Sequence, residues 1–159
     1  MTRTQTVQPT RPTSAQRGFT LVELMIVITL LAVVAGIAVP SFRGMVADNR
    51  IAASTNSVVS ALNYARSEAL REGRRVEVSP RSESDWSRGV SVTQGNNILR
   101  VTEAFNGQLQ VTGDSVSFRG NGLANESGVI RLCSNDGSRG REVRVTLGGR
   151  INTTEVVCE

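Results

Sequence analysis

The residues that could carry chemistry in this chain are few, and the first observation about them is an absence. The 159 residues include no His and only two Cys, Cys133 and Cys158. Ser-His-Asp and Cys-His nucleophile systems need a His, as do His-ligated zinc and iron sites, and two thiolates do not complete a four-thiolate metal site. The sequence therefore predicts a protein that is not an enzyme and that holds no cofactor.

One carboxylate is notable because of its position. Glu23 lies at the start of an apolar run, and no charge interrupts the residues between Glu23 and Arg43. As a helix, this stretch would rise roughly 28 Å, which is close to the thickness of the hydrocarbon layer of a bilayer. An ionised carboxylate beside such a run is costly unless a cation pairs with it, so Glu23 is a candidate functional residue.

The residues before the apolar run predict its orientation in a membrane. Met1 to Arg17 are polar and carry three Arg and no acid, and we expect this stretch to be disordered. By the positive-inside rule, the N-terminus is cytoplasmic and everything after Arg43 lies on the far side. Two processing schemes remain open at this point. The run is either the core of an ordinary secretory signal, with Gly36 and Ala38 as the small residues before a single cut, or a retained membrane helix.

The stretch Arg17-Gly18-Phe19-Thr20-Leu21-Val22-Glu23 resembles the type III signal of type IV pilins and type II secretion pseudopilins. The resemblance implies that prepilin peptidase cuts between Gly18 and Phe19, that the apolar helix is retained, and that Phe19 is N-methylated. It also implies that Glu23 neutralises the terminal amine of a neighbouring subunit during filament assembly, which would set the subunit register. Pro40 matches a Pro that bends or loosens the helix of many pilins by removing an amide donor.

Beyond Pro40 the pattern becomes amphipathic and then strand-like. Val58, Leu62 and Ala65 recur at helical spacing, and this helix should end near Gly73, a natural left-handed cap. Short alternating runs separated by turn residues follow, and they predict an α+β fold with a long N-terminal helix packed on an antiparallel β-sheet head, in two small sheets. The expected strands are 76–79, 89–93, 98–102, 108–111, 115–119, 128–133, 142–147 and a short last one at 156–158.

These patterns divide the chain into four parts. We expect a cleaved leader at residues 1–18, a transmembrane and assembly helix at 19–42, an amphipathic continuation of that helix at 43–73, and a periplasmic β-rich head at 74–159. The leader carries three of the 18 Arg and none of the 14 acidic residues. The mature chain therefore has 15 Arg against 14 acids, and the net charge falls from +4 to +1 before termini are counted.

Several details of the head resemble the GspH/FimT group of minor pilins and pseudopilins. They are the segment Tyr64-Ala65-Arg66-Ser67-Glu68-Ala69, Trp86 followed by Gly89, Phe118 followed by Gly122, and a closing Gly-Arg segment before the final Cys. The family often shows Trp-x-x-Gly-Trp, whereas Val90 follows the Gly here, so one aromatic residue is absent.

This resemblance implies a function in assembly. The chain would be a structural subunit of the tip or priming complex of a type IV pilus, or of a type II secretion pseudopilus. Its partners would be other minor and major pilins or pseudopilins, the prepilin peptidase and the inner membrane. The subunit would span the bacterial inner membrane once before it is extracted into the fibre.

Cys133 and Cys158 both lie on the side expected to be periplasmic, where disulfides persist. A bridge between them would close a loop of about 26 residues and stabilise the fold by roughly 3 to 4 kcal/mol on the chain-entropy model. The alternative is a redox-active thiol pair, but the chain has neither the Cys-x-x-Cys spacing nor a His to lower a thiol pKa.

The segment between the two Cys suggests a second function, DNA binding. FimT-like members implicated in natural transformation carry a Gly-Arg-x-Arg motif near the C-terminus, and Arg can clamp phosphate without reading sequence. The candidate residues here are Arg139, Arg141, Arg144 and Arg150. The match is incomplete, because Asn152 stands where the second Arg is expected. The competing interpretation is that these Arg are solvated strand and turn residues, and DNA uptake is therefore the alternative function.

Overall fold

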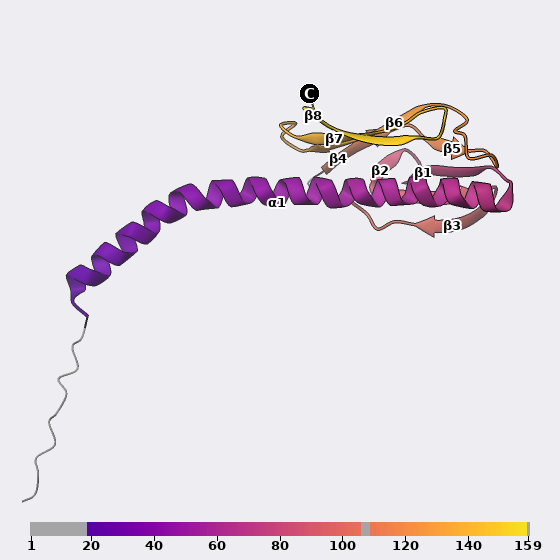
Figure 1. Cartoon of the computed structure of the whole chain (residues 1–159). Coiled ribbons are helices and arrows are strands. Elements are labelled where there is room, and N and C mark those ends of the chain that lie inside the picture. Colours follow the sequence, from indigo (N-terminus) through magenta and orange to yellow (C-terminus); the bar gives the residue numbers. More distant parts are fainter. Residues whose placement is uncertain (1–18, 106–108, 159) are drawn as a thin grey trace, which may run out of the picture. The chain divides into compact units, whose positions relative to one another are not determined.

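The computed structural model describes residues 19–105 and 109–158 (Figure 1). The expected leader, residues 1–18, lies outside the described residues, as does Gln108, where one strand was predicted to begin. The chain divides into two compact units, Met1–Ser41 and Phe42–Glu159. The elements are α1 (Leu21–Glu72), β1 (Val76–Ser82), β2 (Asp85–Gln94), β3 (Asn97–Val101), β4 (Leu109–Gly113), β5 (Val116–Phe118), β6 (Gly128–Ser134), β7 (Gly140–Val145) and β8 (Ile151–Val156).

The described part of the first unit is the apolar start of α1. By length and composition, α1 is a helix that could cross a membrane. Every side chain from Phe19 to Val39 is exposed. An exposed apolar surface of this extent is unfavourable in water, so this part of the helix needs lipid or other protein around it.

In the second unit, α1 buries one narrow stripe. Ile51, Val58, Leu62 and Ala65 lie on this stripe at alternating helical spacing, and all are buried. The helix ends at Glu72, and Gly73 follows with φ of +65°. Because glycine has no Cβ, it adopts this left-handed conformation without a steric penalty, which explains why the helix stops where the sequence predicted.

Two antiparallel sheets of four strands pack on this stripe. Their strand orders are β3-β2-β1-β5 and β4-β6-β7-β8. Figure 1 shows the strands gathered along the C-terminal half of α1. The α+β prediction is therefore confirmed. The shared core contains the helix stripe together with side chains from both sheets, among them Val76, Val78, Val90, Val92, Phe118, Ile130, Leu132, Val143 and Val145.

The last strand differs from its prediction. It was expected at residues 156–158, but β8 spans Ile151–Val156 and pairs with β7 from Val145↔Ile151 to Gly140↔Val156. The reason is a tight turn: Thr146 N–H donates to the Arg150 carbonyl at 3.0 Å, so the chain reverses at once and the ladder starts five residues earlier. Of the predicted residues, only Val156 belongs to β8, and Val157 and Cys158 follow the end of the strand.

Three segments that carry the resemblance to the GspH/FimT group meet at the side of α1. Arg66 Nε donates a hydrogen bond of 3.0 Å to the Gly122 carbonyl. Gly149 has φ of +74°, and a Cβ at this position would overlap the Gly122 carbonyl oxygen and lie 3.1 Å from Arg66 Nε. The backbone can approach the helix this closely only because residue 149 is glycine. The closing Gly-Arg segment therefore has a packing role in this fold.

We predict that Gly149→Ala lowers the free energy of unfolding by about 2 kcal/mol, because it adds both a left-handed backbone penalty and a steric overlap. Urea unfolding followed by circular dichroism measures the change. Gly148→Ala is the matched control, since its Cβ would meet only Thr146 Oγ1, at 3.9 Å. Equal losses for the two variants would contradict the proposed packing role.

Candidate functional site

The described chain begins at Phe19, and the first side-chain contact of the helix involves Thr20. Thr20 Oγ1 accepts a hydrogen bond of 3.2 Å from the Glu23 N–H, and the Thr20 carbonyl accepts one of 3.2 Å from the Leu24 N–H. Thr20 is therefore the N-cap, and Thr-x-x-Glu is the pattern of a capping box. Sequence reasoning missed the role of Thr20, although this spacing could have revealed it.

Glu23 lies in the first turn of α1, where a negative charge interacts favourably with the helix dipole. Within residues 19–105 and 109–158, no cation forms an ion pair with its carboxylate. Phe19 is 87% exposed. Gly18, the other residue of the predicted cleavage site, lies outside the described residues. The carboxylate can therefore receive a cation from another molecule, and its assembly role stays a prediction.

Pro40 lies within α1, directly before the boundary between the two units. It has no amide hydrogen to donate to the carbonyl of Gly36, so the helix lacks one hydrogen bond there. α1 is nevertheless continuous through this position. The predicted kink stays a prediction.

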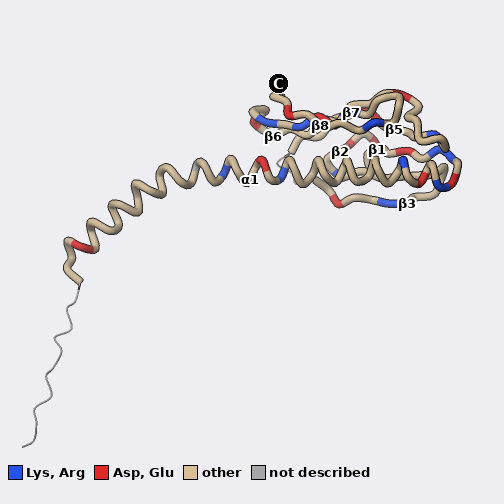
Figure 2. Tube along the Cα trace, viewed as in Figure 1, with Lys and Arg blue, Asp and Glu red and all other residues tan. Residues whose placement is uncertain are grey.

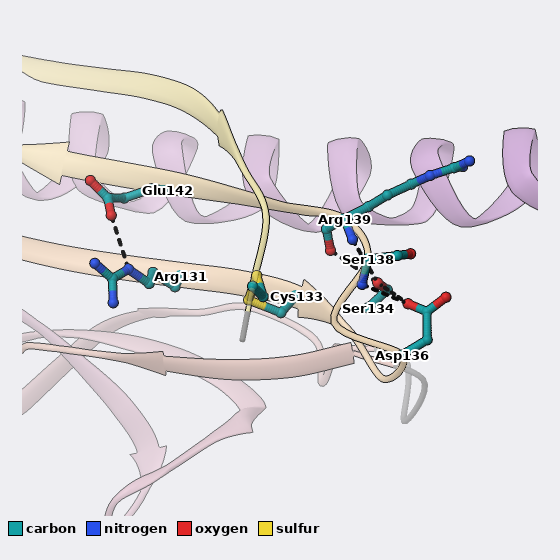
Figure 3. The surroundings of a disulfide bond; sticks show 8 residues. Arg131, Cys133, Ser134, Asp136, Ser138, Arg139 and Glu142 are labelled. Carbon is teal, nitrogen blue, oxygen red and sulfur yellow. Dashed lines mark hydrogen bonds and ion pairs between the residues drawn. A yellow bond between two sulfur atoms is a disulfide. The ribbon is translucent and has the colours of Figure 1, made fainter.

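The two cysteines form the predicted disulfide. Cys133 of β6 is bonded to Cys158, beyond the end of β8, with the Cα atoms 6.1 Å apart (Figure 3). The Cys158 N–H donates to the Gly137 carbonyl at 3.0 Å, so the C-terminal segment is also bonded to the turn between β6 and β7. The end of the chain is thus held by one covalent bond and one hydrogen bond.

The four candidate DNA-binding Arg do not form one basic patch. Arg139 pairs with Asp48 at 2.9 Å, Arg141 with Glu155 at 3.3 Å, and Arg144 with Glu142 at 2.6 Å. Arg150 is exposed and has no ion pair with any residue of the described ranges. Figure 2 shows positive and negative residues interspersed over the β-rich part of the chain.

Two of the four candidate Arg, Arg141 and Arg144, lie on β7, and their positions argue against joint binding of one phosphate backbone. Side chains alternate between the two faces of a strand, so Arg141 and Arg144 project to opposite faces. Three of the four charges are offset by a carboxylate within hydrogen-bonding distance, which weakens attraction to phosphate. DNA binding therefore receives no support from this geometry and stays a prediction.

Glu142 is the most enclosed charge of the head, at 5% exposure. Arg131, directly opposite it on β6, donates from Nε to Oε2 at 2.9 Å, and Arg144 donates to Oε1 at 2.6 Å (Figure 3 shows the first pair). The hydrogen bonds from Arg131 and then Arg144 hold the pKa of the Glu142 carboxyl below its ordinary value of 4.5, despite the opposing effect of burial. Arg131 was missed in the sequence because its partner depends on the register of two strands.

The described residues contain no group of three or more His, Cys, Asp or Glu side chains that could hold a metal ion. The chemically notable groups have structural roles instead. They are a capped helix end with the free carboxylate of Glu23, a disulfide, and carboxylates bonded to Arg. Such an arrangement can fix positions and bind a cation or another chain, which is the chemistry of assembly.

We predict that Glu142→Gln lowers the free energy of unfolding by about 2 kcal/mol at pH 7, because two guanidinium groups lose their shared carboxylate. The folded-state pKa is lowered, so the stabilisation is fully present above the unfolded-state value near 4.5 and is lost as the pH falls through the folded-state pKa. Urea unfolding between pH 7 and pH 2.5 should therefore show the two proteins converging in acid.

The matched control for this experiment is Glu155→Gln, whose side chain is 83% exposed. An exposed pair of this kind contributes at most about 1 kcal/mol, so the variant should remain close to the parent protein at every pH. A stability gap for Glu142→Gln that persists unchanged at pH 2.5 would contradict the role assigned to the ionised carboxylate.

Comparison with known proteins relates these features to a family. The profile of the type II transport protein GspH matches residues 54–149, and that of the prokaryotic N-terminal methylation motif matches residues 13–39. A fimbrial protein of Pseudomonas aeruginosa is 30% identical over 131 residues, which cover 77% of this chain and 82% of that protein. A type IV major alpha-pilin of Moraxella bovis is 28% identical over 100 residues, which cover 63% and 62%.

Solved structures show the same fold. The crystal structure of the type IV minor pilin FimU of Pseudomonas aeruginosa gives a TM-score of 0.59 at 24% identity, covering 69% of this chain and 92% of that one. A second crystal form of FimU gives a TM-score of 0.55. Because the GspH profile spans more than half of the chain and the fimbrial relative is matched over most of its length, the chain belongs to the GspH family of pilins, which are structural subunits and not enzymes.

Proposed function

We propose that the chain is a minor pilin, a structural subunit of the tip or priming complex of a type IV pilus or, in the related system, of a type II secretion pseudopilus. The observation that carries this proposal is the helix surface from Phe19 to Val39, which is apolar and entirely exposed. A membrane covers this surface before assembly, and the helices of neighbouring subunits cover it afterwards. The relatives support both systems, since their names refer to fimbriae, type IV pili and type II transport.

Processing produces the assembly-competent end. Prepilin peptidase cuts between Gly18 and Phe19, and the new amine at Phe19 is methylated. A positive amine at a helix N-terminus is disfavoured by the helix dipole and, in an apolar filament core, by desolvation. The Glu23 carboxylate of a neighbouring subunit offsets both costs. Thr20 supports this pairing by capping the helix, so that its first turn is already formed when the subunits meet.

The head lies in the periplasm, with the short N-terminal segment in the cytoplasm. A disulfide between Cys133 and Cys158 supports this orientation, because such bonds persist in oxidising compartments. The apolar helix anchors the subunit in the inner membrane until it is extracted into the fibre. The head then selects neighbouring pilins or pseudopilins through its exposed loops and strand edges.

DNA uptake is the alternative function, and no contact among the described residues favours it. A phosphate backbone would have to compete with Asp48, Glu155 and Glu142 for Arg139, Arg141 and Arg144. A head that shifts duplex DNA at physiological salt, yet binds no other minor pilin, would nevertheless replace the assembly proposal with the uptake proposal.

The first prediction from this proposal concerns the mature N-terminus. Mass spectrometry of the protein purified from membranes should find a chain that begins with N-methyl-Phe19. In a strain without prepilin peptidase, the same protein should keep the leader. A mature chain that begins at Val39 would instead indicate an ordinary secretory signal and would refute the pilin proposal.

The second prediction separates the two roles open to Glu23, helix capping and charge pairing. Glu23→Ala should be cleaved normally but incorporated into fibres less, by on the order of tenfold, because a buried amine loses its partner. Glu23→Gln is the decisive control, since Gln serves equally well in a capping box but carries no charge. Immunoblots of sheared fibres measure incorporation. Wild-type incorporation of Glu23→Gln would show that capping alone explains this residue.

A further inference from the structure

The turn between β6 and β7 is held rigidly from two sides. Within the turn, the Ser134 N–H donates to the Arg139 carbonyl at 2.8 Å, and the Gly137 N–H donates to the Ser134 carbonyl at 2.9 Å. From outside, the Cys158 N–H donates to the Gly137 carbonyl at 3.0 Å, and the disulfide holds Cys158 against β6 (Figure 3). The disulfide therefore adds a restraint from outside to the hydrogen bonds that the turn makes within itself.

One side chain reaches from this turn to the helix. Arg139 Nη1 donates to the Gly44 carbonyl at 3.1 Å and to Asp48 Oδ2 at 2.9 Å, across more than 90 residues of sequence. In Figure 3 the Arg139 side chain points from the turn along the helix. The guanidinium thus joins the turn to two positions one helical turn apart.

The helix sequence leaves room for this contact. A Cβ at Gly44 would lie 3.1 Å from Arg139 Nη1 and 3.4 Å from Nη2, so the guanidinium would have to shift by a few tenths of an ångström to admit a side chain at this position. Glycine is otherwise unfavourable inside a helix. At position 44, glycine lets the Arg139 guanidinium approach the helix without that shift.

Apolar packing is incomplete at this end of the second unit, where Val46 and Ala47 are only half-buried. Phe42 and Met45 are 65% and 61% exposed, and the first apolar residue of the helix to be fully buried is Ile51, at 3%. The contacts of Arg139 fall on Gly44 and Asp48, in the helical turns before Ile51. The contacts between the head and the helix therefore begin about two helical turns before Ile51.

We propose that the β6–β7 turn, closed by the Cys133–Cys158 disulfide, is a clasp that holds α1 at Gly44 and Asp48 through Arg139. The inference rests on the proposed pilin function, because it concerns the helix that carries assembly, and it adds a device that determines where the head begins to restrain that helix. Arg139 is accordingly a positioning residue: with the disulfide intact, it is bonded to Gly44 and Asp48 and fixes the head against this part of α1.

Hydrogen exchange of the full chain in detergent micelles, read by mass spectrometry, tests the clasp. Arg139→Ala should raise the exchange rates of amides 44–50 about fivefold, the change expected for one exposed charged contact. Asp48→Asn should act in the same direction from the helix side. Arg141→Ala is the matched control, since it removes the neighbouring pair with Glu155 and should leave these amides unchanged.

Reduction tests the dependence on the disulfide. Dithiothreitol supplies two electrons and two protons, the S–S bond breaks to give two thiols, and the reagent closes to its cyclic disulfide. The parent protein should then show the same rise at amides 44–50, with little further rise when Arg139→Ala is reduced. Core amides of β1 and β2 should keep their protection, which shows that the fold is intact.

Gly44→Ala supplies an independent reading of the same contact. Alanine favours the helix, so it should protect amides 44–50 in the Arg139→Ala chain and protect them less, or not at all, when Arg139 is present. Three results would each overturn the clasp. They are equal protection by Gly44→Ala with and without Arg139, no change in exchange for Arg139→Ala, and loss of protection through the whole head on reduction. Fibre incorporation is read separately, so failure of the clasp with normal incorporation leaves the pilin proposal intact.

Discussion

The structure depends on the packing of two small sheets against one narrow stripe of a single helix. Small side chains on that stripe, such as Ala61, Ala65 and Ala69, let the strands approach the helix closely, while Leu62 and Val58 fill the space between the sheets. Because the head buries only one stripe of the helix, the side chains on the opposite face, such as Asn56 and Asn63, stay exposed. The same helix carries a fully exposed apolar segment at its N-terminal end. One part of the helix thus packs in the head, and the other is available to pack with neighbouring subunits of a filament.

The charges of the head serve this packing. The chain uses Arg for every basic residue, and several Arg form short-range contacts with carboxylates or backbone carbonyls. Arg66 holds a loop to the helix, Arg139 holds a turn to it, and Arg131 flanks the enclosed Glu142. A planar guanidinium with several donors suits these bridging positions better than a single ammonium group. Each of these three Arg therefore has a partner within the protein.

Much of the fold could be predicted from the sequence because its signals are local. The helix, its end at Gly73 and the turns are each signalled by residues close together in the sequence. The disulfide follows from two Cys in an oxidising compartment. The start of β8 was missed because its sequence is mostly polar and none of its residues is fully buried, so it lacks the alternating apolar pattern that marks a strand. The partners of Arg139 and Glu142 could not be predicted, because they depend on strand register and on contacts across the whole head.

The close approach of Gly149 to the helix has a consequence for how the C-terminal motif is interpreted. A glycine required by packing will be kept whether or not the residues after it bind anything, so a Gly-Arg pair alone does not diagnose nucleic-acid binding in this fold. The informative position is 152, which lies directly across from Arg144 in the β7–β8 ladder. Arg131 and Arg144 both bond Glu142 on that face of the sheet, so an Arg at position 152 would add a third guanidinium group to it. Asn152 leaves the face with two Arg, both already bonded to Glu142.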